Sequence, residues 1–257
     1  MKILKYPRTQ HLAGSNLQPG DEDLSQVRIE SLLGCQLVVE EKIDGANSGI
    51  CFDSKGELFL QSRGHYLSGG RREKHFALFK TWANCHRSAL WALLSDRYLM
   101  YGEWVYAKHT IFYDHLPHYF LEFDIFDRKE NCFLNTERRA NMLAQSPVSS
   151  VPVLARGTVG SLGHLPDLVK SSLFKSEDWK KNLCIAQESI AGSCEETDFS
   201  DMAEGLYIKV EEAGLVTRRL KWVRHSFTTS VLDSGSHWLD RPIVANGLAP
   251  GVDIYGS

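Results

Sequence analysis

Short apolar runs separated by turn residues recur along the chain, and this pattern restricts the fold more than any other feature of the sequence. Residues 37–42 are apolar and rich in β-branched side chains, and residues 47–52 resume the pattern after Gly45. Residues 57–63 follow the turn signal Asp53-Ser54-Lys55-Gly56. Runs of this length bounded by turn residues are typical of β-strands. These three runs predict an antiparallel meander.

Helical periodicity interrupts the strands. Within residues 74–94, the apolar side chains recur at spacings of three, four or near-multiples of a turn, which predicts an amphipathic helix with its aromatic residues in the core. A second helix is expected to begin at the cap-like Asn135-Thr136-Glu137, and residues 171–200 read as helix with a loop. Further strands are expected at 98–106, 118–126, 151–155, 204–211 and 215–223. The sequence therefore predicts an α+β fold.

Bulk properties set wide limits on function. The chain has 257 residues, of which 43% are hydrophobic and 24% charged, and its net charge is −3. This composition is ordinary for one or two globular domains. Because the net charge is slightly negative, a polyanion would have to be bound by a local basic surface.

The cysteines and the hydropathy pattern indicate the cellular compartment in which we expect the protein. The six cysteines include no C-x-x-C pair, and Met1 to Gln18 is mixed and polar, unlike a secretory leader. No apolar stretch approaches the roughly 20 residues that cross a bilayer. We therefore expect a cytoplasmic protein without a membrane span, in which zinc and disulfide sites are weakly supported.

The sequence Glu41-Lys42-Ile43-Asp44-Gly45-Ala46-Asn47 is the first segment that suggests chemistry. Here a lysine leaves a strand and meets an acid and a glycine within three positions. A K-x-D-G pattern alone should arise by chance in roughly one chain of this length in twenty. On this segment alone, a solvated lysine at a strand end explains Lys42 equally well.

Five further segments follow Lys42 in a fixed order, each forming or ending a predicted strand. They are Gln61-Ser62-Arg63-Gly64, Tyr101-Gly102-Glu103-Trp104, residues 120–126, Glu204-Gly205-Leu206-Tyr207-Ile208-Lys209, and Arg219-Leu220-Lys221-Trp222-Val223. Together with the Lys42 segment, this set resembles the motifs of the covalent nucleotidyltransferase superfamily, which includes ATP-dependent DNA ligases, RNA ligases and mRNA capping enzymes. The resemblance is greatest to RNA ligases of the phage RNA ligase 2 and kinetoplastid editing type, whose lysine motif also ends in asparagine, as here at Asn47.

The resemblance implies a ligase adenylation domain, an ATP-grasp-like fold whose antiparallel sheets form a cleft for ATP. It also implies that Lys42 attacks the α-phosphate of ATP, holds AMP as a phosphoramidate and passes it to a 5′-phosphate end. The 3′-hydroxyl of the second end then displaces AMP. Since a free lysine has a pKa near 10.4, we expect the site to favour the neutral amine by desolvation or by nearby positive charge.

The resemblance also assigns roles to the other motif residues. Glu103 is expected to accept the ribose hydroxyl of ATP, and Phe123, with Phe120 or Phe126 as alternatives, to stack on adenine. Asp44 and Glu204 are expected to hold Mg²⁺ or Mn²⁺ directly or through water. The remaining expected nucleotide contacts are Glu41, Asn47, Arg63, Lys209, Arg219 and Lys221, of which Lys221 is also expected to act in catalysis, as is Asp44. Alternation along the strand places Arg219 and Lys221 on one face, although this superfamily commonly has a lysine where the chain has Arg219.

Several other features have simpler explanations than a catalytic role. His109, His115 and His118 lack the spacing of a helical metal site. The Ser68–Arg72 segment reads as a loop, because it lacks the Gly-Lys-Ser/Thr ending of a nucleotide-binding loop, but Arg71 and Arg72 are candidates to contact a polynucleotide backbone. The N-terminal Tyr6-Pro7-Arg8-Thr9 segment is a candidate to fold back and help hold a substrate end.

The predicted organisation is an adenylyltransferase domain at residues 1–225 and an extended tail at 226–257, too short for the oligonucleotide-binding barrel that follows the catalytic domain in many DNA ligases and capping enzymes. The expected substrate is RNA with 5′-phosphate and 3′-hydroxyl ends, supplied in some settings by an end-healing kinase and phosphatase. A DNA ligase and an mRNA guanylyltransferase are alternative enzymes. An inactive nucleotide- or RNA-binding module is the alternative outside enzymes.

Overall fold

The strands that the structure describes join into one sheet, whose main path passes through nine of them. A computed structural model of the chain describes residues 2–17, 20–21, 23–188, 197–227 and 242–256. In the described part, the order along the sheet is β4-β3-β5-β6-β7-β11-β10-β2-β9, with β1 beside β11 and β8 beside β6. The strands are β1 Gln10–His11, β2 Leu37–Lys42, β3 Ala46–Phe52, β4 Leu58–Ser62, β5 Tyr98–Trp104, β6 Phe120–Asp127, β7 Cys132–Leu134, β8 Ser149–Ser150, β9 Val153–Gly157, β10 Gly205–Glu212 and β11 Leu215–Val223.

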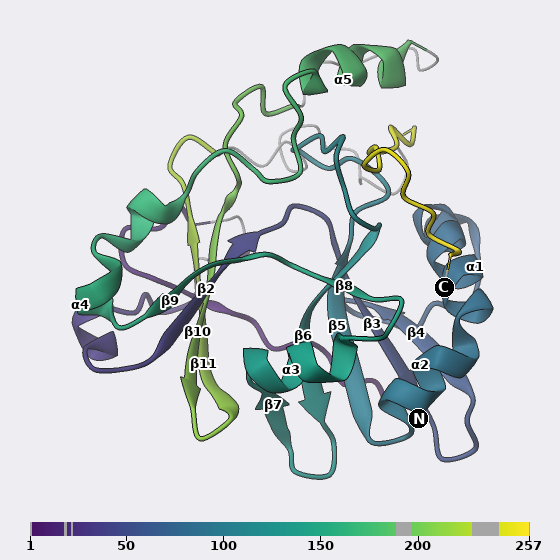
Figure 1. Cartoon of the computed structure of the whole chain (residues 1–257), viewed down its shortest axis with the longest axis horizontal. Coiled ribbons are helices and arrows are strands. Elements are labelled where there is room, and N and C mark those ends of the chain that lie inside the picture. The colour runs from purple at the N-terminus through teal and green to yellow at the C-terminus, as the bar shows by residue number, and fades with distance from the viewer. Residues whose placement is uncertain (1, 18–19, 22, 189–196, 228–241, 257) are drawn as a thin grey trace.

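Two groups of strands make up this sheet, as Figure 1 shows. One group contains β3, β4, β5 and β6, and the other contains β2, β9, β10 and β11. The short strand β7 joins them, because it pairs with β6 on one side and β11 on the other. The pairs on the main path are antiparallel, as expected for an α+β fold.

The predicted meander is half right. The hairpin of β3 and β4 is present, with Ser48 opposite Ser62. However, β2 pairs with β10 and β9 instead of β3, so the chain crosses between the two strand groups at residues 43–45. The crossing is tight: a Cβ on Gly45 would lie 2.7 Å from Val105 Cγ1 and 2.9 Å from the Trp104 carbonyl oxygen. Local periodicity identified the strands, but the pairing of β2 depends on segments more than 100 residues away.

The predicted helix at 74–94 is divided into three pieces. A 3₁₀ turn at Arg71–Phe76 leads into α1, Ala77–Cys85, and His86 separates α1 from α2, Arg87–Leu94. His86 has φ −97° and ψ 14°, which lies outside the helical region. The break allows both helices to bury apolar side chains in one cluster against β3 and β5, and Phe79, Trp82 and Leu90 are fully buried there, which confirms their predicted place in the core.

The remaining boundaries differ from the predicted ones by a few residues. Asn135 caps α3, Thr136–Leu143, by accepting a hydrogen bond from the Arg138 amide, as its residue type predicts. The strand expected at 151–155 lies at Val153–Gly157 as β9, and the one expected at 118–126 begins at Phe120. The other helices are η1 Ile29–Leu32, α4 Val159–Leu162, η3 Leu165–Leu168 and α5 Trp179–Gln187, and α5 lies within the segment read as helix with a loop.

The described end of the chain packs against the body of the fold. The Asn246 side chain accepts a hydrogen bond from the Tyr113 amide at 2.9 Å and donates one to the Val105 carbonyl at 2.7 Å. Residues 228–241 of the predicted tail lie outside the described residues. Among the described helices, none combines the length and the apolar character needed to cross a bilayer.

Candidate active site

A pocket of about 900 Å³ opens where the two strand groups meet. Its volume is typical of a site for a nucleotide-sized ligand. Seven of the residues predicted from the sequence line it: Glu41, Lys42, Asn47, Arg63, Glu103, Phe123 and Lys221. These residues come from β2, β3, the end of β4, β5, β6 and β11, so the pocket exists only when both strand groups are assembled.

Lys42 stands at the end of β2 and faces Glu204. Its Nζ lies 2.7 Å from each carboxylate oxygen of Glu204. The pairing follows from the register of β2 and β10, in which Lys42 is opposite Gly205. Gly205 is required by close packing, because a Cβ there would lie 2.0 Å from the Trp222 carbonyl oxygen on β11. The sheet therefore brings the predicted nucleophile and a predicted metal ligand together.

The charge on Lys42 differs from our expectation. Burial opposes its charge, but the carboxylates of Glu204, Glu103 and Asp44 outweigh burial and raise the pKa of Lys42. The amine is therefore held protonated by neighbouring acids, not neutral by desolvation or nearby cations. A cation that binds these carboxylates in place of the Lys42 ammonium group is needed before Lys42 can act as a nucleophile.

The acids around Lys42 are themselves perturbed. Burial raises the pKa of Glu103 to about 8, against the opposing effect of Lys42, and the negative charge of Glu204 adds to the rise. Burial likewise raises the pKa of Glu204 to about 7. Carboxylates crowded in a buried site gain free energy by binding a cation, and clusters of this kind are typical of functional sites.

Asp44 supports the pocket from behind. Its Oδ2 accepts hydrogen bonds from the amides of Thr110 and Ile111, at 2.7 and 2.8 Å, and its own amide donates to the Tyr113 hydroxyl. The side chain is 9% exposed and is not among the pocket-lining residues. In this arrangement Asp44 fixes the segment that presents His109 to the pocket.

The structure separates the cations predicted to contact the phosphates. Lys221 lines the pocket, and its Nζ donates to the Asp21 carboxylate. Arg219, two residues earlier on the same strand, lies with its guanidinium 3.7 Å from the centre of the Phe133 ring, outside the pocket lining. Lys209 is fully buried between Glu40, at 2.8 Å, and Asp124, at 3.2 Å. Of the cations that the motifs predicted to contact the nucleotide, Lys42, Arg63 and Lys221 therefore line the pocket, and Lys209 and Arg219 do not.

Aromatic side chains form the apolar side of the pocket. The Phe123 ring lies edge-on to the Tyr6 ring at 5.1 Å and is tilted against the Tyr207 ring at 6.0 Å. Phe120 is fully buried against Phe79, which excludes Phe120 as a surface for stacking. Asn47 also lines the pocket, and its buried Oδ1 has no hydrogen-bond partner among the described residues. This oxygen can therefore accept a hydrogen bond from a ligand.

Sequence reasoning missed several pocket residues. His65, Gly69, Gly70, His109 and Tyr207 all line the pocket. The position of Tyr207 was available from the sequence, because alternation on β10 places it two residues from Lys209 on one face. The others sit on loops, whose placement depends on the body they pack against. The candidate segment Tyr6–Thr9 also lines the pocket; the side chains of Arg71 and Arg72 lie outside the described ones.

The oxygen ligands suit a hard cation that keeps most of its water. The described residues contain no group of three or more His, Cys, Asp or Glu side chains arranged as a metal cage. Glu204, at 4% exposed, and the partly buried Glu103 present carboxylates beside Lys42. Mg²⁺ characteristically binds through one or two carboxylates together with substrate phosphates and water, so this pair fits such an ion only when a phosphate is present.

Comparison with known proteins identifies the family. A variant of the Naegleria gruberi RNA ligase with ATP and Mn is similar in structure, with a TM-score of 0.50 and 17% identity over 87% of this chain and 56% of that one. A second variant of that ligase with ATP and Mn gives 0.48, at 17% identity over 84% and 59%. An archaeal ATP-dependent RNA ligase gives 0.46, at 17% identity over 86% and 48%.

The first of these structures shows the same fold, and the chain spans between about half and three fifths of the length of these ligases. No curated protein sequence matches the chain. The sequence profile of the family described as RNA ligase, however, matches residues 36–223, which include every predicted motif from Lys42 to Lys221. The chain belongs to the RNA ligase family.

Proposed function

We propose that the chain is an ATP-dependent RNA ligase that joins 5′-phosphate and 3′-hydroxyl RNA ends through a lysyl-AMP intermediate on Lys42. The observation that carries the proposal is the position of Lys42. Its amine lies in a nucleotide-sized pocket, in contact with Glu204 and within the electrostatic reach of Glu103 and Lys221. Family membership supports the same chemistry, and relatives of the same fold have been solved with ATP and Mn.

In the first step, the neutral amine of Lys42 attacks the α-phosphorus of ATP, a P–N bond forms and the bond to pyrophosphate breaks. Lys221 and Arg63, which line the pocket, would offset the negative charge on the phosphates. Phe123 and Asn47, which also line the pocket, would contact the base. A divalent ion, held by Glu204 with Glu103 or Asp44, would neutralise the phosphates and remove the carboxylate that keeps Lys42 protonated.

In the next two steps, the 5′-phosphate oxygen of RNA attacks the phosphorus of lysyl-AMP and releases Lys42, and the 3′-hydroxyl then displaces AMP from the activated end. We place this chemistry in RNA repair, on ends prepared by a kinase and a phosphatase where the break leaves other termini. The likeness to the phage RNA ligase 2 and editing-ligase type remains a prediction from the sequence. So does the division into a catalytic domain at 1–225 and a tail at 226–257.

A label-transfer experiment tests the proposal. Protein stripped of bound nucleotide is incubated with Mg²⁺ or Mn²⁺ and α-labelled ATP or GTP, and the adduct is mapped by mass spectrometry. We expect AMP on Lys42, no adduct in the folded Lys42→Ala variant, and sealing of 5′-phosphate RNA in preference to DNA. GMP on Lys42 would indicate a capping enzyme, preferred sealing of DNA a DNA ligase, and the absence of any adduct a nucleotide-binding module.

A further inference from the structure

A segment outside the family match reaches the active site from the N-terminal side. In it, β1 lies parallel to β11, with His11 opposite Lys221. The Leu12 amide donates to the Lys221 carbonyl at 2.8 Å, and the Asn16 amide donates to the Val223 carbonyl at 2.9 Å. The segment is therefore bonded along the backbone of the strand that carries Lys221, and we call residues 8–16 with Gly20 and Asp21 the N-terminal strap.

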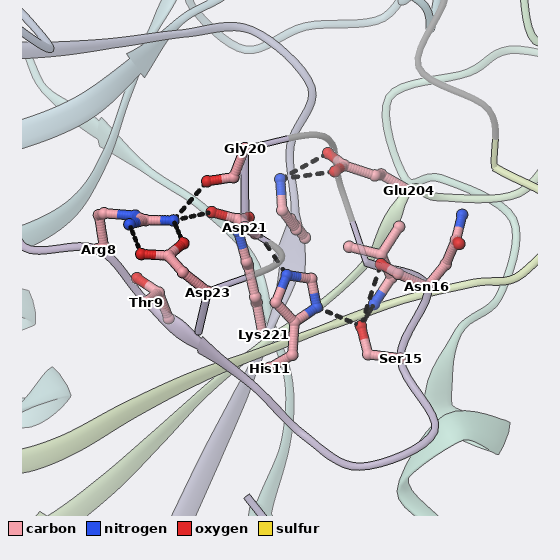
Figure 2. Close-up of polar contacts among 12 residues, drawn as sticks. Arg8, Thr9, His11, Ser15, Asn16, Gly20, Asp21, Asp23, Glu204 and Lys221 are labelled. Atoms are coloured by element: carbon pink, nitrogen blue, oxygen red, sulfur yellow. Dashed lines mark hydrogen bonds and ion pairs between the residues drawn. The ribbon is translucent and has the colours of Figure 1, made fainter. Parts of the chain in front are cut away.

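The strap places one carboxylate on Lys221. Figure 2 shows Asp21 between Arg8, His11 and Lys221. Its Oδ2 accepts a hydrogen bond from Lys221 Nζ and lies 3.2 Å from His11 Nε2, and its Oδ1 lies 3.3 Å from Arg8 Nη2. The side chain of Asp21 is 9% exposed and that of Lys221 is 14% exposed. This ion pair is thus largely shielded from solvent at the edge of the pocket.

His11 fixes the orientation of Asp21. The ring is fully buried, and burial lowers the pKa of His11, so the neutral form with a single N–H is favoured. A neutral ring can satisfy both neighbours in only one tautomer: Nε2–H donates to Asp21, and Nδ1 accepts from the Ser15 hydroxyl at 2.6 Å. The Ser15 oxygen in turn accepts from the Val223 amide at 2.9 Å. A continuous chain of hydrogen bonds therefore runs from the backbone of β11 through Ser15 and His11 to Asp21.

Resting on the ligase function proposed above, we propose that Asp21 is a positioning residue that holds the ammonium group of Lys221 in the pocket, with His11 as its support. A lysine head group on a flexible four-carbon stem loses rotamer entropy when it is fixed. Lys221 must also point toward a second cation: burial lowers the pKa of Lys221, and Lys42 lies close enough to lower it further. Asp21 offsets both costs before the nucleotide arrives.

Asp21 does not have to leave when a phosphate binds. An ammonium group has three N–H donors, of which Asp21 uses one, so the others remain for phosphate oxygens. Asp21 itself is held by His11 and Arg8 in addition to Lys221. This arrangement distinguishes a positioning residue from a latch, in which Asp21 would compete with the phosphates for Lys221.

A double-mutant cycle on the full chain tests the proposal. The rate of lysyl-AMP formation is measured in single turnovers at varied ATP for wild type, Asp21→Asn, Lys221→Met and the double variant. We expect Asp21→Asn to lower the rate at saturating ATP about 10- to 100-fold, and to change it less than threefold when Lys221 is already methionine. Asp21→Glu, which keeps the charge, should recover part of the rate.

Asp23→Asn is the matched control. Asp23 bonds to the same Arg8 at 2.6–2.7 Å, but its side chain is 71% exposed and it does not contact Lys221 among the described contacts. The rate of lysyl-AMP formation in Asp23→Asn should equal that of wild type. If Asp21→Asn fails to fold, His11→Gln carries the test, with a smaller loss that also vanishes in the Lys221→Met background.

Three results would overturn the proposal. The first is an unchanged rate in Asp21→Asn, and the second is a faster rate or tighter ATP binding in that variant, which indicates a latch. The third is an equal loss of rate from Asp21→Asn in wild type and in the Lys221→Met background, which indicates a purely structural role. The wild-type reaction separates these results from failure of the ligase function. If wild type forms lysyl-AMP, the function stands whatever Asp21→Asn does.

Discussion

Two clusters of charged side chains meet at β2, which carries Glu40 of one cluster and Lys42 of the other, and they differ in what surrounds them. The first, which we call the core network, joins Arg139 to Glu122 and Glu40, and Lys209 to Glu40 and Asp124. Its four ion pairs span 2.7–3.2 Å, and no side chain in it is more than 2% exposed. Charges so completely removed from water are tolerated only when they are paired.

The second, which we call the pocket cluster, contains Lys42 with Glu204 and Glu103, and Lys221 with Asp21. Its cations are accessible to a ligand, since the Lys42 side chain is 23% exposed and that of Lys221 14%. The two acids beside Lys42 have raised pKa values, about 7 for Glu204 and about 8 for Glu103. These charges are only partly compensated by each other, which leaves free energy to be gained from phosphate and metal.

The comparison shows why motif membership alone does not assign a role. Lys209 and Lys221 both lie in motif segments and carry the same functional group, yet one is enclosed by carboxylates and the other faces the pocket. Substitutions in the core network should therefore affect stability, and those in the pocket cluster should affect activity.

Lys209→Met should give the largest loss of stability. The substitution leaves Glu40 and Asp124 buried with less compensating charge, which costs about 3–5 kcal/mol when one partner of a buried pair is removed. Urea unfolding measures the change. Arg139→Met is the matched control from the same network and should cost a similar amount. If Lys209 instead binds the triphosphate, ATP affinity of the folded protein will fall in Lys209→Met alone.

Among substitutions that leave both the fold and Lys42 intact, Glu204→Gln should give the largest loss of activity. Removing the charge weakens cation binding beside Lys42, and losing one electrostatic contact at a reacting centre typically costs 10²–10³-fold in rate. Label transfer from ATP measures the effect, and urea unfolding should show little change. Glu212→Gln, at the exposed end of β10, is the control and should be indistinguishable from wild type. Equal rates for both variants would remove Glu204 from the mechanism.

The pocket acids should make stability depend on pH. The folded-state pKa values of Glu103 and Glu204 are raised, so the folded protein binds more protons than the unfolded chain between about pH 4.5 and 8. Their favourable contribution is complete below the unfolded pKa and is lost as the pH rises through 7 and 8. Thermal melts without metal should therefore show falling stability across this range, and Glu103→Gln should flatten the slope. An unchanged slope would contradict the burial of this charge.

The smallest effect is expected at the surface. Arg87 pairs with Glu57 at 3.1 Å, and their side chains are 43% and 63% exposed. Exposed pairs of this kind contribute about 0.2–1 kcal/mol and are screened by salt. Glu57→Gln should therefore change the free energy of unfolding by less than about 1 kcal/mol and leave label transfer unaltered. A larger loss of stability would mean that the exposed fraction of an ion pair does not predict how much the pair contributes to the free energy of unfolding.

Much of the fold could be predicted because it depends on local patterns. The strand at 37–42 coincides with β2, that at 215–223 coincides with β11, and Asn135 caps α3 as its residue type suggests. The break at His86 and the pairing of β2 with β10 could not be predicted in this way. Both depend on which distant part of the chain covers an apolar face. The periodicity of a segment contains no information about the segment that packs against it.

The sequence by itself determined the motif residues, their order and the chemistry of a nucleophilic lysine among acids and cations, because these depend on residue type and spacing. Tertiary structure alone decided which of them share one pocket. It placed Lys209 in the core, Arg219 against Phe133, and Asp21 from the N-terminal strap on Lys221. The physical reason is that burial and the nearest charges set a side chain's protonation and accessibility, and both arise from strands paired across more than 150 residues of sequence.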